Sequence, residues 1–346
     1  MIYAEDVTIE SVFLHHIGNK SLEEGCKFSE EPLLMDDKVE VALKTYFFES
    51  FNDKELYHLD HDVDIKLNEI YSYVGQIFSG ESTLKEQANN IARHLYRCSD
   101  HPNIKPGELC IALLRDCQIE GQVLDAVGIF KAENKDTFLK VIARKNQFEV
   151  ESDEGINVGK LDKGCLIFNT DEEEGYLVTV VDQTNKGVEA RFWSDEFLHL
   201  KHRRDIYFNT NNVLEACKSF VSEALPEEYT MEKADQIDLL NKSIGYFKDN
   251  ERFVQEEFEV AVFKDPDVIQ SFQSFNTQFA DERDMDMPQS FEISKDAVKK
   301  KSRVFKSVIK LDKNFHVYVH GNRDFIERGT DPDGRKFYKL YYDNEQ

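Results

Sequence analysis

The residues with the clearest chemical potential are cations gathered in one short segment. Residues 295–328 hold ten Lys and Arg against four acidic residues, while the whole chain has a formal net charge of -24. A positive segment in an acidic chain is typical of a confined site for a polyanion such as DNA, and a merely solvated charged face is the alternative. The cations assigned to phosphate binding here are Lys299, Lys300, Lys301, Arg303, Lys306, Lys310, Lys313, Arg323 and Arg328.

Two predicted strands give this segment a polar outer face. Apolar and polar residues alternate along 305–311 and 315–320, around a turn signal at 312–314. Rings that stack on bases, beside cations that hold phosphates, are typical of a nucleic-acid surface, although an ordinary solvated hairpin face has the same pattern. The predicted buried face is Ile309, Leu311, Phe315, Val317 and Val319, and the predicted outer face is Lys306, Lys310, His316, Tyr318 and His320.

Two further elements are expected to support this surface. Ser294 is a candidate N-cap for a short helix in which Asp296 precedes the cations Lys299–Arg303, the charge order that a helix dipole favours. The basic stretch at 201–204 is a candidate extension of the phosphate track. Its contributing cations are Lys201, Arg203 and Arg204.

No motif that carries a reaction is present. The chain has no GxxxxGK, GxGxxG, GxSxG or HExxH pattern, so we expect neither an enzyme nor a cofactor. His316 and His320 stand four residues apart on a predicted strand, roughly 13 Å, which is too far for one ion. The acidic loop at 281–288 lacks the spacing of a calcium loop, and a nuclease that binds metal through such loops is the least favoured alternative.

Hydrophobic patterning predicts an α+β fold. Helices are expected near 36–52, 62–79 and 82–98, the last with Ser82 or Thr83 as N-cap. An antiparallel β meander follows, with flanking helices; a helical segment and a small C-terminal antiparallel sheet complete the chain. The predicted domains are residues 1–205 and 206–346. The meander's strands are expected at 109–115, 123–130, 137–143, 165–169 and 176–182, with an opening strand at 6–17.

Composition excludes several classes of protein. Hydrophobic residues make up 40% of the chain and Phe alone numbers 26, which is enough for a packed core. No apolar stretch reaches about 18 residues, so no transmembrane helix is expected, and the N-terminal residues do not resemble a secretory signal. The six cysteines form no CxxC pair and lie on apolar stretches, which favours free thiols in a reducing compartment. Trp193 is expected in the core.

The chain resembles a known bacterial family over nearly its full length. The similar stretches are HHIGNK at 15–20, VGIFKAENKDTFLKV at 127–141, LIFNTDEEEGYLV at 166–178 and FKSVIKLDKNFHVYVHGNRDFIERGTD at 305–331. They are similar to the bacterial nucleoid-associated protein family, the NdpA-like group, in a variant of Bacteroidetes type. The resemblance implies a cytoplasmic protein of the nucleoid, with DNA or DNA-bound proteins as partners.

The sequence and the resemblance together predict a non-enzymatic nucleoid-associated protein. It is expected to contact DNA weakly, without strong sequence preference, through residues 295–328. The alternative is an acidic interaction protein that docks onto DNA-bound enzymes such as topoisomerases without tight DNA contact of its own. Because a net charge of -24 repels the duplex outside one basic patch, both interpretations stay open at this stage. The sequence leaves the oligomeric state open.

Overall fold

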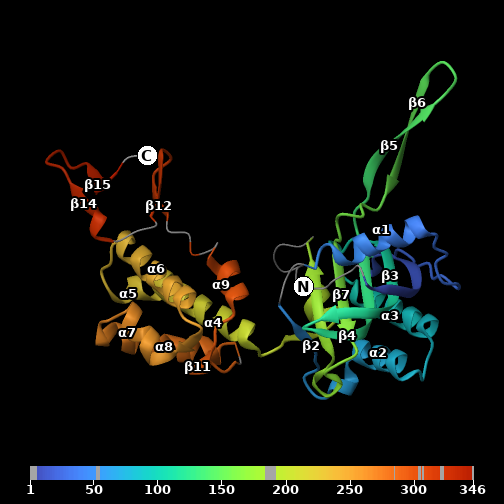
Figure 1. Ribbon diagram of the computed structural model, residues 1–346, viewed down its shortest axis with the longest axis horizontal. Coiled ribbons are helices and arrows are strands. Elements are labelled where there is room, and N and C mark those ends of the chain that lie inside the picture. Colours follow the sequence, from blue (N-terminus) through green and yellow to red (C-terminus); the bar gives the residue numbers. More distant parts are fainter. Residues whose placement is uncertain are drawn as a thin grey trace. The chain divides into compact units, whose positions relative to one another are not determined.

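The computed structural model divides the chain into two compact units, Met1–Arg203 and Arg204–Gln346. It describes residues 6–51, 55–183, 192–283, 285–302, 305, 308–319 and 323–344. Figure 1 shows a sheet-based first unit and a helical second unit that carries small hairpins. That these units are independent domains, with a boundary at residue 205, stays a prediction.

The first unit is built on a seven-stranded antiparallel sheet with the order β1-β3-β4-β7-β8-β2-β9. The predicted meander is therefore confirmed as an antiparallel sheet, with β1 and β2 added at or near its edges. Its strands are β1 Thr8–Ile17, β2 Tyr57–Leu59, β3 Gly107–Ile119, β4 Gln122–Ala132, β7 Lys163–Phe168, β8 Leu177–Asp182 and β9 Leu200–His202.

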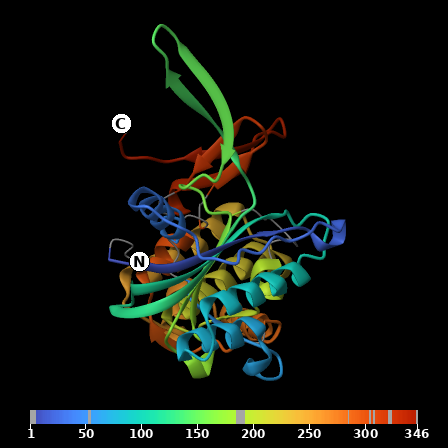
Figure 2. The same cartoon turned by 90° about the vertical axis from the view of Figure 1, so that its right-hand side faces the viewer.

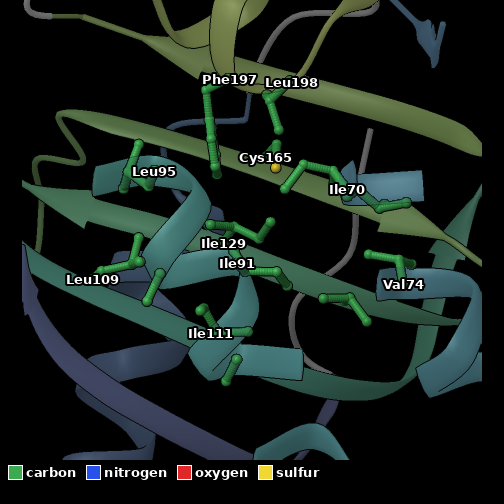
Figure 3. Close-up of a cluster of buried hydrophobic side chains, with 14 of the residues drawn as sticks. Ile70, Val74, Ile91, Leu95, Leu109, Ile111, Ile129, Cys165, Phe197 and Leu198 are labelled. Carbon is green, nitrogen blue, oxygen red and sulfur yellow. The ribbon is translucent and has the colours of Figure 1, made fainter. Parts of the chain in front are cut away.

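Helices cover both faces of this sheet because its central strands are apolar on both sides. On β3, Leu109 and Ile111 join the core beneath α2 (Glu69–Ser79) and α3 (Leu84–Cys98), whereas Cys110 joins the core beneath α1 (Asp37–Phe48). Neighbouring residues of a strand point to opposite faces, so an unbroken apolar run serves two cores. Figure 3 shows the first core: Ile70, Val74, Ile91 and Leu95 from the helices lie over Leu109, Ile111, Ile129 and Cys165 of the strands.

Local signals set several boundaries as the sequence predicts. Thr83 caps α3, since its hydroxyl accepts a hydrogen bond from Glu86 N–H while the Glu86 carboxylate accepts one from Thr83 N–H, both at 3.3 Å.

Trp193 is fully buried in a π-helical turn at Phe192–Phe197. All six cysteines have free thiols: Cys110, Cys117, Cys165 and Cys217 are buried, and Cys26 and Cys98 are half-buried.

One predicted strand lies outside the sheet. Residues 137–143 belong to β5 (Asp136–Ala143), which pairs with β6 (Phe148–Gly155) in a separate two-stranded ribbon, while β4 pairs directly with β7. Figures 1 and 2 both show this ribbon extending away from the body of the first unit. The prediction that residues 137–143 belong to the meander is therefore wrong. Strand β6 was not predicted, because its acidic residues conceal its strand character.

The second unit is a bundle of helices around a phenylalanine-rich core. Its core includes Phe220, Phe247, Phe258 and Phe272, whose rings contact one another edge-on or tilted. A π-helical turn at Phe220–Ala224 links the first two helices. The helices are α4 Ile206–Ser219, α5 Leu225–Glu228, α6 Lys233–Asp249, α7 Gln255–Val262, α8 Pro266–Asp281 and α9 Lys295–Ser302, with a small ribbon of β10 Arg252–Val254 and β11 Ser290–Glu292.

Two short hairpins complete this unit, as the predicted small C-terminal antiparallel sheet. They are formed by β12 (Val308–Leu311) with β13 (Phe315–Tyr318), and by β14 (Ile326–Thr330) with β15 (Lys336–Leu340). Both pack on the start of α6 through one apolar cluster. This cluster comprises Ala234, Ile237, Ile309, Val319 and Ile326. No described helix is long and apolar enough to span a membrane.

Candidate nucleic-acid interface

The β12–β13 hairpin has the two faces that its alternation predicts. Lys310 pairs with His316 across the strands, so their side chains share a face, and Tyr318 lies on the same face opposite Val308. Lys310, His316 and Tyr318 are all exposed. Lys306 and His320, which the sequence assigned to this face, lie outside the described residues, as does Arg303.

The inner face is buried only at one end of the hairpin. Ile309 and Val319 are buried against α6, and Leu311 and Val317 are half-buried. The prediction that Phe315 is buried is wrong, because its side chain is 63% exposed. Phe315 lies beside the turn, opposite Leu311, and is not part of the cluster that packs on α6. The outer end of the hairpin therefore projects an aromatic ring as well as cations.

Helix α9 presents its cations beside a buried anchor. Ser294 caps it as predicted, accepting a hydrogen bond from Ala297 N–H at 3.4 Å, and Ala297 and Val298 are buried. Lys299 is exposed; the Lys300 ammonium lies 5.9 Å from the centre of the Tyr207 ring. Lys301 forms an ion pair with Glu215 at 2.8 Å. The three consecutive lysines thus have three different environments.

Several predicted phosphate ligands already have carboxylate partners. Arg323 Nη2 lies 2.8 Å from Glu232 Oε2, in addition to an ion pair with Asp235 at 2.7 Å. Arg203 donates to both oxygens of Glu120, at 2.9 and 2.7 Å, and these hydrogen bonds hold the pKa of that carboxyl below its usual range. The remaining pairs are Lys201 with Asp60 at 3.3 Å and Arg204 with Asp286 at 3.2 Å.

Four predicted cations are unpaired within the described part of the chain. Lys299, Lys310, Lys313 and Arg328 form no ion pair with a described carboxylate, and all four are exposed. They lie on α9, on the β12–β13 hairpin and on β14. A cation without a local partner can bind a phosphate and release its counterions without first giving up an ion pair.

A second basic and aromatic element was not predicted from the sequence. Residues 335–342, RKFYKLYY, contain three cations, four aromatic rings and no acid, and this composition was the signal that could have identified them. On the β14–β15 hairpin, Phe337 lies opposite Gly329, and a side chain at that glycine would meet the Phe337 ring at 2.3 Å, so the ring lies over the bare backbone. The Lys339 ammonium lies 4.9 Å from the centre of the Tyr341 ring, and Tyr342 is largely exposed.

Comparison with known proteins places this surface in context. The family model described as nucleoid-associated protein YejK matches residues 13–334. The chain belongs to this family. The nucleoid-associated family match spans most of the sheet of the first unit and, in the second unit, the helices, the β12–β13 hairpin and strand β14. Its end at residue 334 leaves the whole basic and aromatic stretch at 335–342 outside the match. A search of curated proteins found no significant match.

Membership of the nucleoid-associated family confirms the resemblance found in the sequence, whereas the Bacteroidetes-type variant stays a prediction. Within the described ranges, no group of three or more His, Cys, Asp or Glu side chains is arranged to hold a metal ion. The arrangement found at the C-terminal hairpins is one of exposed cations and rings. Such groups hold phosphates and stack on bases.

Proposed function

We propose that this protein is a non-enzymatic member of the bacterial nucleoid that binds DNA weakly and without strong sequence preference. The observation that carries the proposal is a set of four exposed cations on α9 and the two C-terminal hairpins that have no ion-pair partner among the described residues. That set is Lys299, Lys310, Lys313 and Arg328. The family match supports a nucleoid-associated role, and with it a location in the nucleoid within the cytoplasm.

The chemistry of these residues favours contact with the DNA backbone over base recognition. Lys and Arg that bind phosphates fix position but carry no sequence information. Four such contacts would give a log–log dependence of duplex affinity on salt of about -3 to -4. The net charge of -24 repels the duplex elsewhere, so we expect low affinity at physiological salt.

Residues with carboxylate partners have a smaller expected role. A cation that already has a carboxylate partner must give up that ion pair before it can bind a phosphate of the DNA. The cations with such a partner are Lys201, Arg203, Arg204, Lys301 and Arg323. That exchange gains little because one anion replaces another. The proposal keeps the other assigned cations as phosphate ligands. Arg303 and Lys306 are included on the evidence of the sequence alone. The rings of His316 and Tyr318 would contact unpaired bases.

The test is a salt titration of binding, with fluorescein-labelled duplex and single strands of equal length. The variant replaces Lys299, Lys310, Lys313 and Arg328 by Ala. A matched control replaces Lys38, Lys66, Lys85 and Lys160, four exposed lysines of the first unit, so that the net charge changes equally. We expect the first variant to bind more weakly, with a salt slope shallower by about 3 to 4, and the control to keep most of the slope. Equal affinity and slope for all three proteins would refute the proposal.

A second candidate function rests on the ion pairs themselves. Five predicted DNA ligands are neutralised by local carboxylates, which leaves a surface of mixed charge on an acidic body. Such a surface suits docking onto basic faces of DNA-bound enzymes, for example topoisomerases. If the fourfold variant binds DNA like the wild type, this interaction role becomes the better explanation.

A further inference from the structure

We call the β5–β6 ribbon the arm. Hydrogen bonds hold its base, the root of the arm, to the body of the first unit. At its base, Asp162 accepts hydrogen bonds from the backbone N–H groups of Glu133 and Asn134, at 2.7 and 2.8 Å, and so joins the outgoing and returning chain. Lys131 is fully buried there, 2.8 Å from Glu133 Oε1, and burial lowers the pKa of its ammonium. These contacts lie in the body of the first unit and leave residues 136–155 to extend from it (Figures 1 and 2).

One face of the arm carries a mainly apolar stripe, from Leu139 to Ala143 on β5 and from Phe148 to Ser152 on β6. In the register of the ribbon, Leu139 lies opposite Ser152, Val141 opposite Val150, and Ala143 opposite Phe148. Residues that are directly opposite share a face, so these six side chains lie together and none of them is charged. Leu139, Val141, Phe148 and Val150 are between 60% and 76% exposed. We call this set the arm stripe.

The other face of the arm is charged and suited to water. Lys140 lies opposite Glu151, and Ile142 lies opposite Glu149, which forms an ion pair with Arg144 at 2.9 Å. Phe138 is partly exposed on this face, opposite Asp153. An amphipathic ribbon of two strands has marginal stability by itself, and an exposed apolar face of this kind is typical of an interaction site.

We propose that the arm stripe pairs with the arm stripe of a second copy of this chain. The two ribbons would stack face to face and antiparallel, with a two-fold axis through the Val141–Val150 pair. Leu139 of each copy then faces Ala143 of the other, Phe148 faces Ser152, and each valine meets its own counterpart. Large side chains therefore lie against small ones, as close packing requires. The proposal is independent of DNA binding.

The distribution of charge favours a second copy of the chain as the partner, and it favours antiparallel stacking of the two ribbons. None of the six stripe residues is charged, and Glu154, which shares this face opposite Thr137, lies beyond the stripe toward the base of the arm. Burial of the stripe therefore carries no ionic desolvation cost, whereas the charged face stays in water. A parallel stack would also set large side chains against small ones, but it would hold two bodies of charge -24 on the same side of the interface. The antiparallel stack directs them to opposite ends of the paired arms.

The size of the stripe sets the expected strength. The stripe covers five residues of each strand, so it is about 17 Å long, with a face roughly 10 Å wide. This footprint is well below the about 800 Å² that each partner buries in a standard interface. We therefore expect a weak dimer, visible by sedimentation at high protein concentration and dissociated on dilution.

The test uses charges placed on the two-fold axis of the full-length chain without DNA. In the antiparallel stack Val141 meets Val141, so Val141→Lys and Val141→Glu should each weaken self-association at least about tenfold, because like charges are juxtaposed. An equimolar mixture of the two variants should associate again as a heterodimer. The matched control is Phe138→Lys, the same kind of change on the opposite face of the same strand, and it should associate like the wild type.

Each outcome decides the proposal. A wild-type chain that sediments as a monomer at all concentrations overturns it, and so does self-association that Val141→Lys leaves unchanged. If the mixture stays monomeric while the double variant V141K/V150E associates with itself, the ribbons stack in parallel and the proposed geometry is wrong. Circular dichroism of every variant separates loss of pairing from loss of fold.

Discussion

The guanidinium Nε of Arg323 donates a hydrogen bond to Asp235 Oδ1 at 2.7 Å. Asp235 lies in the first turn of α6, where it also accepts a hydrogen bond from Glu232 N–H. The same guanidinium donates to the Ile326 carbonyl at the start of β14. Arg323 therefore ties the C-terminal hairpin to the start of α6, and hydrogen bonding to Asp235 raises its pKa further above neutrality.

Replacing Arg323 by Ala should reduce stability more than DNA binding. Loss of these charged hydrogen bonds should lower the free energy of unfolding by about 1–2 kcal/mol, given partial exposure of the group. Urea titration followed by circular dichroism measures this loss. Arg328→Ala, on β14 and without an ion pair to any described carboxylate, should keep the stability and weaken DNA binding. The reverse pattern would contradict the assignment of roles.

Aromatic rings on the last hairpin should distinguish single strands from duplex. Phe337→Ala and Tyr342→Ala should each reduce single-strand affinity by roughly tenfold, since stacking on one base contributes about 1–3 kcal/mol. Duplex affinity should change little because paired bases offer no free face. Fluorescence anisotropy with both probes measures the difference, and Phe138→Ala, an exposed ring on the charged face of the arm, serves as control. Equal losses on both probes would exclude stacking.

Acid should destabilise the first unit through His15. This side chain is buried, its Nδ1 accepts a hydrogen bond from Ser29 N–H, and burial together with Arg93 lowers its pKa to about 4. The unfolded chain takes up the proton near pH 6.5 and the folded chain does not, so stability falls as pH decreases from about 6.5 to about 4, by up to about 3 kcal/mol. His15→Asn should flatten this dependence in thermal melts. His16→Asn, its exposed neighbour, should not.

Thiol reactivity should separate two classes of cysteine. Burial raises the pKa of Cys110, Cys117 and Cys217 to about 12 and also raises that of Cys165, so these groups should resist alkylation in the folded protein. Cys26 and Cys98 are half-buried and should react slowly, Cys98 with its pKa raised to about 11. Counting modified thiols by mass spectrometry with and without urea checks this. Rapid native labelling of Cys165 would contradict the packing.

Features with a local signal were predictable. The alternation along residues 308–318 predicted the two faces of the β12–β13 hairpin, and the spacing of Thr83 and Glu86 fits the start of α3. The apolar run at 109–114 predicted a strand but not that it contributes to two cores, because that depends on which helices cover each face.

Features that depend on distant partners were not predictable. Arg203 and Glu120 are 83 residues apart, and Arg323 and Asp235 are 88 apart, so no window along the sequence reveals that these cations are paired. Composition alone counted them as phosphate ligands. The acidic strand β6 likewise depends on its pairing with β5 rather than on its own residues.

The root of the arm makes residues 136–155 a natural place for the chain to change in length. Asp162 binds the backbone of Glu133 and Asn134 whatever the length of the chain between Asn134 and Asp162. Pairs of residues can therefore be added or removed there in evolution while the sheet of the body persists. Engineering has the same freedom: a short turn that joins residues 135 and 156 should give a folded protein without an arm. A deletion that reaches Glu133 should fail, because it leaves the Lys131 ammonium buried without its carboxylate.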